Sequence, residues 1–199
     1  NKDVRWALTL AINIVDVSLA SYKGAATISA IAVPPTGMYP KLYFDPLEEW
    51  LRNFTLDIAG EKFAPYDPDA SLRVAEKVRP ELGDQVPTDP TAIRKALGYG
   101  WWQFNPQMAE KRLLKNGFKR DKDGKWLLPD GKPWKITLIH EGPARPIMNR
   151  AATMIAEQWR AFGIDAQTEV TELVFPQRMP LGDFDAAMGW NIETWGGHP

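Results

Sequence analysis

Three stretches near the C-terminal end decide the fold of this chain: WKITLIH (134–140), IDAQTEV (164–170) and FDAAMGW (184–190). Their apolar, β-branched and aromatic residues predict three strands. Between the first two, residues 144–162 place apolar side chains at helical spacing, and residues 175–179 predict a short helix before the third. This order is typical of βαβ units with right-handed crossovers, so the sequence predicts an α/β fold.

The residues upstream of these strands predict mainly helices. The first begins behind Asp3 as its N-cap, and the Asn105-Pro106 pair begins another that ends at Gly117. The expected helices cover residues 4–13, 15–22, 46–54, 69–78, 90–97 and 106–117. Residues 34–46 are rich in Pro and Gly and predict an irregular crossing, and Asp-Gly turns on both sides of 125–128 predict a small hairpin. The helices beside a possible boundary at 83–90 look like parts of one layer.

Composition excludes several classes of function. The 199 residues carry a formal net charge of −1 and 44% hydrophobic residues, which is typical of a globular chain and not of a polyanion-binding protein. The absence of cysteine excludes disulfides and thiolate metal sites, and two histidines exclude a three-His zinc site. The longest apolar run, residues 28–35, is too short to span a bilayer, and residues 1–11 do not have the pattern of a signal peptide.

Three polar motifs have a structural and a functional interpretation. The Asp121 turn resembles half a calcium loop, but Lys132 occupies the position of the closing glutamate, which favours a β-turn. His140 ends a predicted strand and is either structural or at the rim of a ligand site. Asp183 and Asp185 are expected on one side of the last strand, where they are either a glycosidase pair or ordinary turn residues.

The nine tryptophans are the unusual feature of the composition, since an indole ring suits both a core and a ligand-stacking surface. If Trp101 and Trp102 are extended, they point in opposite directions, one into the core and one towards a groove. Residues 189–197 (GWNIETWGG) follow the last strand, where ligands bind in open α/β sheets. There Glu193 lies between Trp190 and Trp195, which fits recognition of an amine or a polyol, although a solvated loop is an equal alternative.

Four segments, in order along the chain, resemble the family 5 extracellular solute-binding proteins of ABC importers, the oligopeptide, dipeptide and nickel-binding group. Residues 4–13 (VRWALTLAIN) are similar to the family's "VRxALxxAID" helix, and 105–118 (NPQMAEKRLLKNGF) to its "DPxxAxxLLxxAGF" helix. Residues 151–165 resemble the long helix that ends in "xxxLxxxGI", and 182–190 (GDFDAAMGW) resemble "GxFDxxxxGW".

The resemblance implies that residues 1–199 form a single α/β lobe, a mixed sheet flanked by helices, of a two-lobed periplasmic clamshell. In peptide-binding relatives an acid three residues after the Gly-Trp pair holds the α-ammonium group of the peptide, and Glu193 has that position here. Arg178 matches an arginine that some relatives direct towards the ligand. Trp190, Asn191, Trp195 and His140 complete the expected ligand-binding residues.

The implied function is that of a non-enzymatic, periplasmic or extracellular substrate-binding component, lipid-anchored in a Gram-positive host. Its partners would be an oligopeptide or similar solute, the second lobe of the same protein and ABC permease subunits. Neither a metal, a cofactor nor nucleic acid is expected. The sequence after Gly-Trp, with Ile192 and Glu193 in place of the usual Asp-Tyr, leaves an oligosaccharide ligand open, and a carbohydrate-active hydrolase is the alternative from another class.

Overall fold

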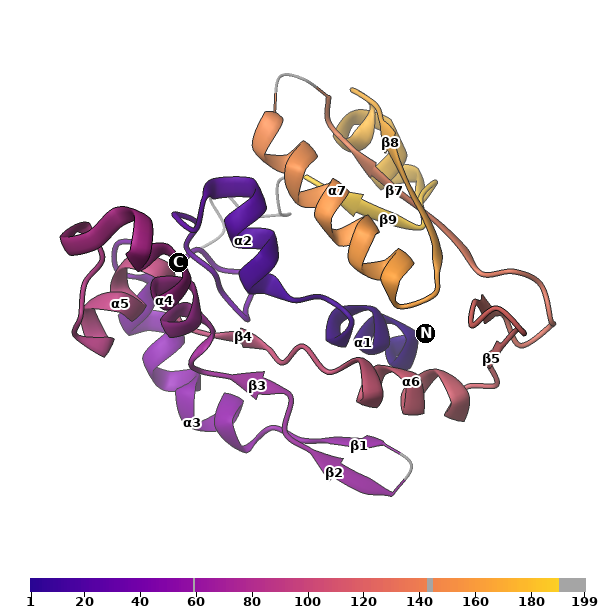
Figure 1. The fold of residues 1–199 in the computed structure, drawn as a ribbon, viewed down its shortest axis with the longest axis horizontal. Helices are drawn as coiled ribbons and strands as arrows, with labels where there is room; N and C mark the ends of the chain where they lie inside the picture. Colours follow the sequence, from indigo (N-terminus) through magenta and orange to yellow (C-terminus); the bar gives the residue numbers. More distant parts are fainter. Residues whose placement is uncertain (59, 143–144, 190–199) are drawn as a thin grey trace.

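The structure is a computed structural model that describes residues 1–58, 60–142 and 145–189. Its main sheet has three parallel strands in the order β8-β7-β9, with bounds Lys135–His140 for β7, Asp165–Val170 for β8 and Ala186–Met188 for β9. Helix α7 (Pro146–Ala161) connects β7 to β8, as Figure 1 shows. This arrangement confirms the predicted strand, long helix and strand.

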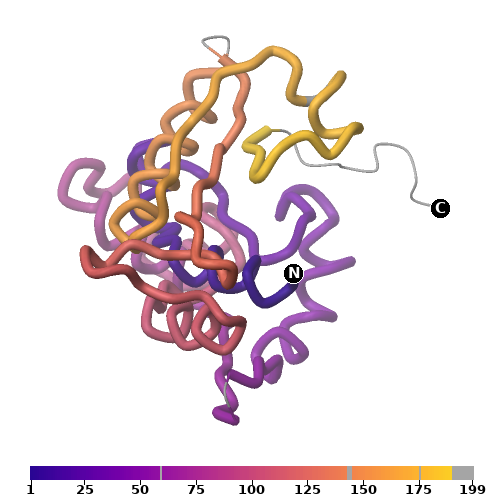
Figure 2. Tube along the Cα trace, turned by 90° about the vertical axis from the view of Figure 1, so that its right-hand side faces the viewer, coloured from indigo at the N-terminus to yellow at the C-terminus, as the bar shows by residue number. Residues whose placement is uncertain are grey.

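Strand β9 is shorter than the strand predicted at residues 184–190 because the residue before it contacts β7 through a side chain and not through backbone pairing. Asp185 accepts a hydrogen bond through Oδ2 from the backbone N–H of Thr137, at 2.9 Å, and pairing of β9 with β7 begins one residue later. Between β8 and β9 the chain forms a π-helical turn, η3 (Val174–Arg178), and one turn of α-helix, α8 (Met179–Leu181). This segment (yellow) lies on the opposite side of the sheet from α7 (orange), as Figure 2 shows.

Three further helices pack beside α7 around the larger of two core clusters. They are α1 (Lys2–Leu10), α2 (Ile14–Tyr22) and α6 (Pro106–Lys115). The side chains of Asn1, Asn13 and Asn105 cap their N-termini by accepting backbone N–H groups. Asp3 is therefore not the N-cap that the sequence predicted, because the helix begins at Lys2 and the Asp3 carboxylate pairs with Arg112 of α6 instead.

The second, smaller core cluster joins two helices on the other side of α2. Helices α4 (Ala70–Leu82) and α5 (Pro90–Leu97) bury Ala75, Val78 and Ile93 together with Val86. The short turn η2 (Gly83–Gln85) connects them, so the chain between these helices reverses direction within one layer. Helix α3 (Asp45–Asn53) follows a π-helical turn, η1 (Pro40–Phe44), which corrects the prediction of an irregular crossing up to residue 46.

The antiparallel pairs form small sheets of their own and do not extend the parallel sheet. They are β1 (Leu56–Ile58) with β2 (Glu61–Phe63), β3 (Tyr66–Asp67) with β4 (Trp101–Trp102), and β5 (Lys119–Arg120) with β6 (Trp126–Leu127). The last pair is the predicted hairpin. Its turn is closed by Asp121 Oδ1, which accepts the backbone N–H groups of Asp123 and Lys125.

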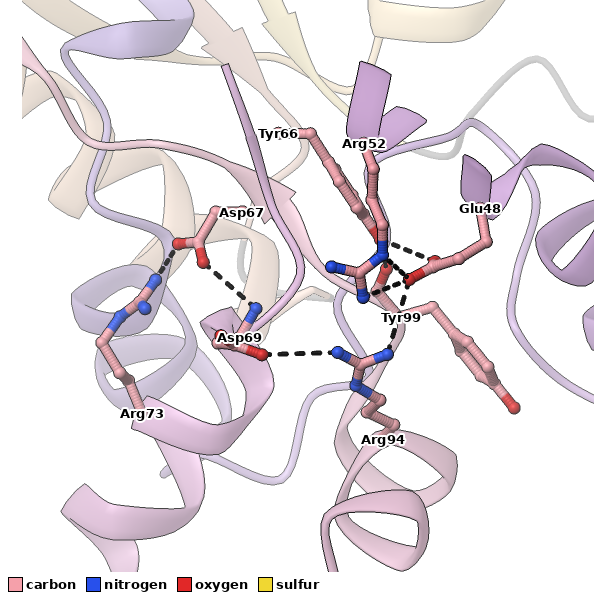
Figure 3. Close-up of polar contacts among 8 residues, drawn as sticks. All are labelled: Glu48, Arg52, Tyr66, Asp67, Asp69, Arg73, Arg94 and Tyr99. Carbon is pink, nitrogen blue, oxygen red and sulfur yellow. Dashed lines mark hydrogen bonds and ion pairs between the residues drawn. The ribbon is translucent and has the colours of Figure 1, made fainter. Parts of the chain in front are cut away.

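A polar network connects α3, β3 and α5 (Figure 3). The Tyr66 hydroxyl donates to the backbone carbonyl of Tyr99 at 2.5 Å and lies 3.3 Å from Glu48 Oε2. Arg94 lies between Glu48 and Asp69, at 3.6 and 3.3 Å. Because these groups come from three elements, the network fixes β3 and therefore its partner β4.

Within the described residues, no single helix has the length and apolar character needed to cross a membrane. Helices α1 and α2, which meet at a 65° bend, satisfy the same measures of length and composition only when they are taken together.

Candidate functional site

The carboxyl ends of β7, β8 and β9 define one edge of the parallel sheet, at His140, Val170 and Met188. Ligands of open α/β sheets bind outside this edge. We call it the carboxyl edge.

His140 is at the carboxyl edge but inside the core. Its side chain is 1% exposed, and Nδ1 lies 2.9 Å from the backbone carbonyl of Glu141. A carbonyl oxygen only accepts, so Nδ1 carries the proton of this hydrogen bond. The side chain lies on the face of β7 that packs against α7, together with Ile136 and Leu138. A ligand can reach this ring only if the surrounding side chains move.

Arg178 lies on the opposite face of the sheet. Its Nη1 is 2.9 Å from Glu169 Oε1, and its Nε is 2.9 Å from Asp183 Oδ2. These residues line a hollow of about 330 Å³ beside Thr137 and Ile139 of β7. The guanidinium group is therefore paired with two carboxylates, and the sheet separates it from His140.

Asp183 and Asp185, the pair that a hydrolase would use, both have partners within the protein. Asp183 pairs with Arg178, and its backbone carbonyl also accepts from Arg178 Nε at 2.6 Å. Asp185 accepts from the Thr137 N–H. Both lie just before β9, at the entry to the strand where the sequence placed them. Their contacts hold the start of β9 in place.

Trp190, Asn191, Glu193 and Trp195 lie outside the described residues, so their assignment to the ligand site stays a prediction. In the described part of the chain, no group of three or more His, Asp or Glu side chains could hold a metal ion.

A groove of about 600 Å³ lies beside α2. We call it the edge groove. Its walls are one face of α2, including Val17, Ser18, Ser21 and Tyr22, together with residues 26–36 and Trp101 of β4. Most of its lining is apolar, and its volume is within the range of roughly 300–1,000 Å³ that small-molecule sites have.

The edge groove is next to the carboxyl edge because of how α2 packs on α7. Gln158, near the end of α7, bonds to the backbone of Asn13 at the start of α2, whereas Arg150, near the start of α7, bonds to Ser21 at the end of α2. The two helices are therefore antiparallel. Because α7 starts just after β7 ends, the last turn of α2, which bears Ser21 and Tyr22, lies at the carboxyl edge.

The opposite wall of the groove is held by backbone contacts. Ile28 pairs with Gly98 in a parallel bridge, in which Ile28 N–H donates to Leu97 and Tyr99 N–H donates to Ile28. Ser29 Oγ donates to the carbonyl of Ile31 at 2.6 Å and curls the chain beyond the bridge. A polar side chain thus shapes a segment that has no regular secondary structure.

Two polar groups in the groove walls have no hydrogen-bond partner among the described residues. They are Ser18 Oγ, on a residue that is 2% exposed, and the indole Nε1 of Trp101. Buried polar groups normally have a partner, but both atoms are themselves buried and are not exposed to the groove. Trp101 lines this groove, as predicted for one member of the Trp pair, but Trp102 is only half-buried, which corrects the prediction that the other member lies in the core.

Reasoning from the sequence missed the edge groove. Residues 28–35 form the longest apolar run of the chain, and we weighed them only against a membrane span. The signal available was that this run contains Pro34 and Pro35, has Gly24 before it and Gly37 after it, and follows a predicted helix, which favours an apolar surface segment over a core strand.

Comparison with known proteins gives a family and a fold. No curated protein matches the chain. Among solved structures, the periplasmic oligopeptide-binding protein of an oligopeptide ABC transporter from Thermotoga maritima is 22% identical, with a TM-score of 0.56 over 94% of this chain and 26% of that one. The mannohexaose-bound form of that protein is also 22% identical, with a TM-score of 0.54 and the same coverage.

A third structure, the oligopeptide-binding protein OppA, is 24% identical, with a TM-score of 0.51 over 95% of this chain and 22% of that one. The chain thus has one portion of the periplasmic-binding-protein fold and spans about a quarter of the length of these proteins. The model of the bacterial extracellular solute-binding proteins, family 5 (middle), matches residues 1–199. This chain therefore belongs to the family 5 bacterial extracellular solute-binding proteins.

Proposed function

We propose that residues 1–199 are one lobe of the substrate-binding component of an ABC importer. The protein captures an oligopeptide or a similar small solute between this lobe and a second one, and delivers it chemically unchanged to the permease. It acts in the periplasm or, with a lipid anchor, on the surface of a Gram-positive cell.

The observation that carries this proposal is the position of the edge groove. In a chain of this family, an apolar groove of about 600 Å³ lies beside α2, whose last turn is bonded to the start of α7 near the carboxyl edge of the parallel sheet. A groove on one lobe becomes an enclosed site when a second lobe closes on it. Enclosure removes apolar ligand surface from water, and that provides affinity without any covalent chemistry.

Within this proposal the residues after β9 fix the orientation of the ligand. Glu193 binds the α-ammonium group of a peptide, Trp190 and Trp195 provide apolar contact area, and Asn191 donates or accepts hydrogen bonds. Support comes from the chain itself, in which an acid follows the Gly-Trp pair by three residues. Arg178 contributes through its Glu169 and Asp183 partners, by holding the segment that leads into β9.

A second candidate ligand is an oligosaccharide. The nine tryptophans of the chain favour it, because aromatic faces stack on sugar rings. The similar Thermotoga maritima protein, whose solved structure contains mannohexaose, adds support.

The test uses the full-length protein. Native mass spectrometry identifies any ligand that purifies with it, and calorimetry then compares a short peptide with the same peptide N-acetylated. We expect the free peptide to bind wild type more tightly, and Glu193→Gln to remove that preference, because truncating a charge partner costs about 2–5 kcal/mol. If a neutral oligosaccharide purifies with the protein and Glu193→Gln leaves its affinity unchanged, the oligosaccharide is the ligand. Release of a shortened ligand would contradict both.

A further inference from the structure

A second pocket, of about 470 Å³, lies on the other side of β4 from the edge groove. Successive residues of a strand face opposite ways, so Trp101 lines the groove while Trp102 lines this pocket. The start of α2, the β3 segment and residues 103–104 form the other walls. We call this the Trp102 pocket.

The aromatic wall of the Trp102 pocket is held rigidly. The indole of Trp102 packs edge-on against Trp6, with ring centroids 4.9 Å apart, and contacts Phe54 and Tyr66 at 6.3 and 6.2 Å. These rings fix its orientation, so stacking a ligand on Trp102 costs little side-chain entropy. Phe104, at the rim of the pocket, is 51% exposed, so its ring is accessible to a ligand.

Two amide side chains provide hydrogen-bonding groups in fixed positions. Asn13 Oδ1 accepts the Val15 N–H at 3.1 Å, and Gln103 Nε2 donates to the carbonyl of Ala64 at 3.0 Å. One end of each amide is thereby held by backbone. The other ends, a donor on Asn13 and an acceptor on Gln103, have no partner among the described residues.

The charges of the pocket cancel. Asp67 and Arg73 both line it, and they pair with each other through Asp67 Oδ2 and Arg73 Nη2. Asp67 Oδ1 in turn accepts the backbone N–H of Asp69 at 3.1 Å. The pocket therefore has no unbalanced formal charge that would hold an ammonium or carboxylate group, while guanidinium N–H groups of the half-exposed Arg73 remain as donors.

We propose that the Trp102 pocket binds a neutral, hydroxyl-rich ring such as one hexose unit of a saccharide. The C–H face of such a ring is apolar and stacks on Trp102 and Phe104. Its hydroxyl groups both donate and accept, which matches the Asn13 donor, the Gln103 acceptor and the Asp67–Arg73 pair. The pocket is a second site that adjoins the edge groove, with which it shares Ile14, but it lies across β4 and does not depend on which solute the edge groove takes.

The test is saturation-transfer NMR of the full-length protein with cellobiose and maltose as probes and dialanine as a charged comparison. We expect at least one disaccharide to bind with a dissociation constant on the order of 1 mM, as suits a shallow open pocket. Phe104→Ala and Gln103→Leu should each weaken that binding by about tenfold, since each removes one stacking or hydrogen-bonding contact. Leu114→Ala, at an equally exposed position on α6 that lines neither pocket, should leave it unchanged, and Tyr22→Ala reports whether the sugar instead occupies the edge groove.

Three results would overturn the proposal. They are the lack of any disaccharide signal with wild type, a signal that survives both Phe104→Ala and Gln103→Leu, and a signal that only Tyr22→Ala removes. The last result would place the sugar in the edge groove and support an oligosaccharide as the transported solute, so failure here is distinct from failure of the proposed function. Thermal unfolding of each variant shows that a lost signal is not lost folding.

Discussion

Arg150 of α7 donates two hydrogen bonds to the backbone carbonyl of Ser21, from Nη2 at 2.7 Å and from Nε at 3.2 Å. Ser21 is the next-to-last residue of α2, and a cation at this end of a helix interacts favourably with the helix dipole. This contact fixes the wall of the edge groove to the helix that begins beside the carboxyl edge.

Arg150→Met should therefore affect both stability and binding. Loss of the charged hydrogen bonds is expected to lower the free energy of unfolding by about 2 kcal/mol. The affinity for the transported solute should fall as well, because Ser21 and Tyr22 are no longer held. Urea unfolding and calorimetry measure the two effects. Arg5→Met, at an exposed arginine of α1, should change stability by less than about 0.5 kcal/mol.

Gly98→Ala should disrupt the other wall of the groove. Gly98 has a φ of +116°, and a Cβ there would lie 1.9 Å from the carbonyl oxygen of Ile28. The bridge that docks the wall cannot form, and we expect a loss of more than about 3 kcal/mol of stability, measured by urea unfolding. Gly37→Ala is the matched control, since Gly37 also has a positive φ, +59°, but no atom within 4 Å of a Cβ. It should cost only about 1 kcal/mol. Equal costs would show that the Ile28 contact is unimportant.

Asp3 gives the chain a stability that acid removes. Its hydrogen bond from Asn116, followed by that from Arg112, holds the pKa of the Asp3 carboxyl below its ordinary value of 3.8. A lowered pKa contributes stability above the unfolded-state value, and this contribution is lost as pH falls through the folded-state value. Asp3→Asn should lower the free energy of unfolding by about 2 kcal/mol at neutral pH, since Arg112 is only 6% exposed and loses its counter-charge.

The difference between wild type and Asp3→Asn should shrink as pH falls below 3.8, when measured by urea unfolding at several pH values. Asp57→Asn is the control. Asp57 is 68% exposed and lies 3.9 Å from Lys115, so its removal should cost less than about 1 kcal/mol. A difference between wild type and Asp3→Asn that is independent of pH would contradict the account.

Tyr66 gives the chain a stability that alkaline pH removes. Burial, and then the negative charge of Glu48, raise the pKa of the Tyr66 hydroxyl well above its ordinary value of 10.0. A raised pKa contributes stability that is fully present below the unfolded-state value and is lost as pH rises from there to the folded-state value. The free energy of unfolding of wild type should thus fall above pH 10, by up to about 1.4 kcal/mol per pH unit more than that of Tyr66→Phe. Parallel curves for the two proteins would disprove this role.

The sequence was sufficient for the elements whose pattern is local. The strands at residues 134–140 and 164–170 and the helix between them follow from hydrophobic spacing, and the Asp121 turn follows from its Asp-Gly chemistry. The N-cap of helix α1 was harder to predict. Asn1 and Asp3 are both good N-cap residues, and only the tertiary contact of Asp3 with Arg112 decides between them.

The candidate site depended on contacts between distant residues. The edge groove exists because Arg150 reaches Ser21 and because Ile28 pairs with Gly98, and nothing in the local sequence indicates either contact. Likewise, the sequence left His140 as either a structural residue or one at the rim of a ligand site, and only the family resemblance directed Arg178 towards the ligand. The alternation of β7 instead turns the histidine into the core, and the Glu169 carboxylate of β8 pairs with the arginine on the other face.

Calorimetry of the full-length protein with a short peptide or saccharide identified by native mass spectrometry tests most directly whether the edge groove takes the transported solute. We predict one ligand per protein, recovered afterwards with its mass unchanged, and an affinity that falls at least about tenfold in Tyr22→Ala but not in Leu114→Ala, a similarly exposed position on α6. Equal affinities in the two variants, or a ligand recovered in pieces, would contradict the account.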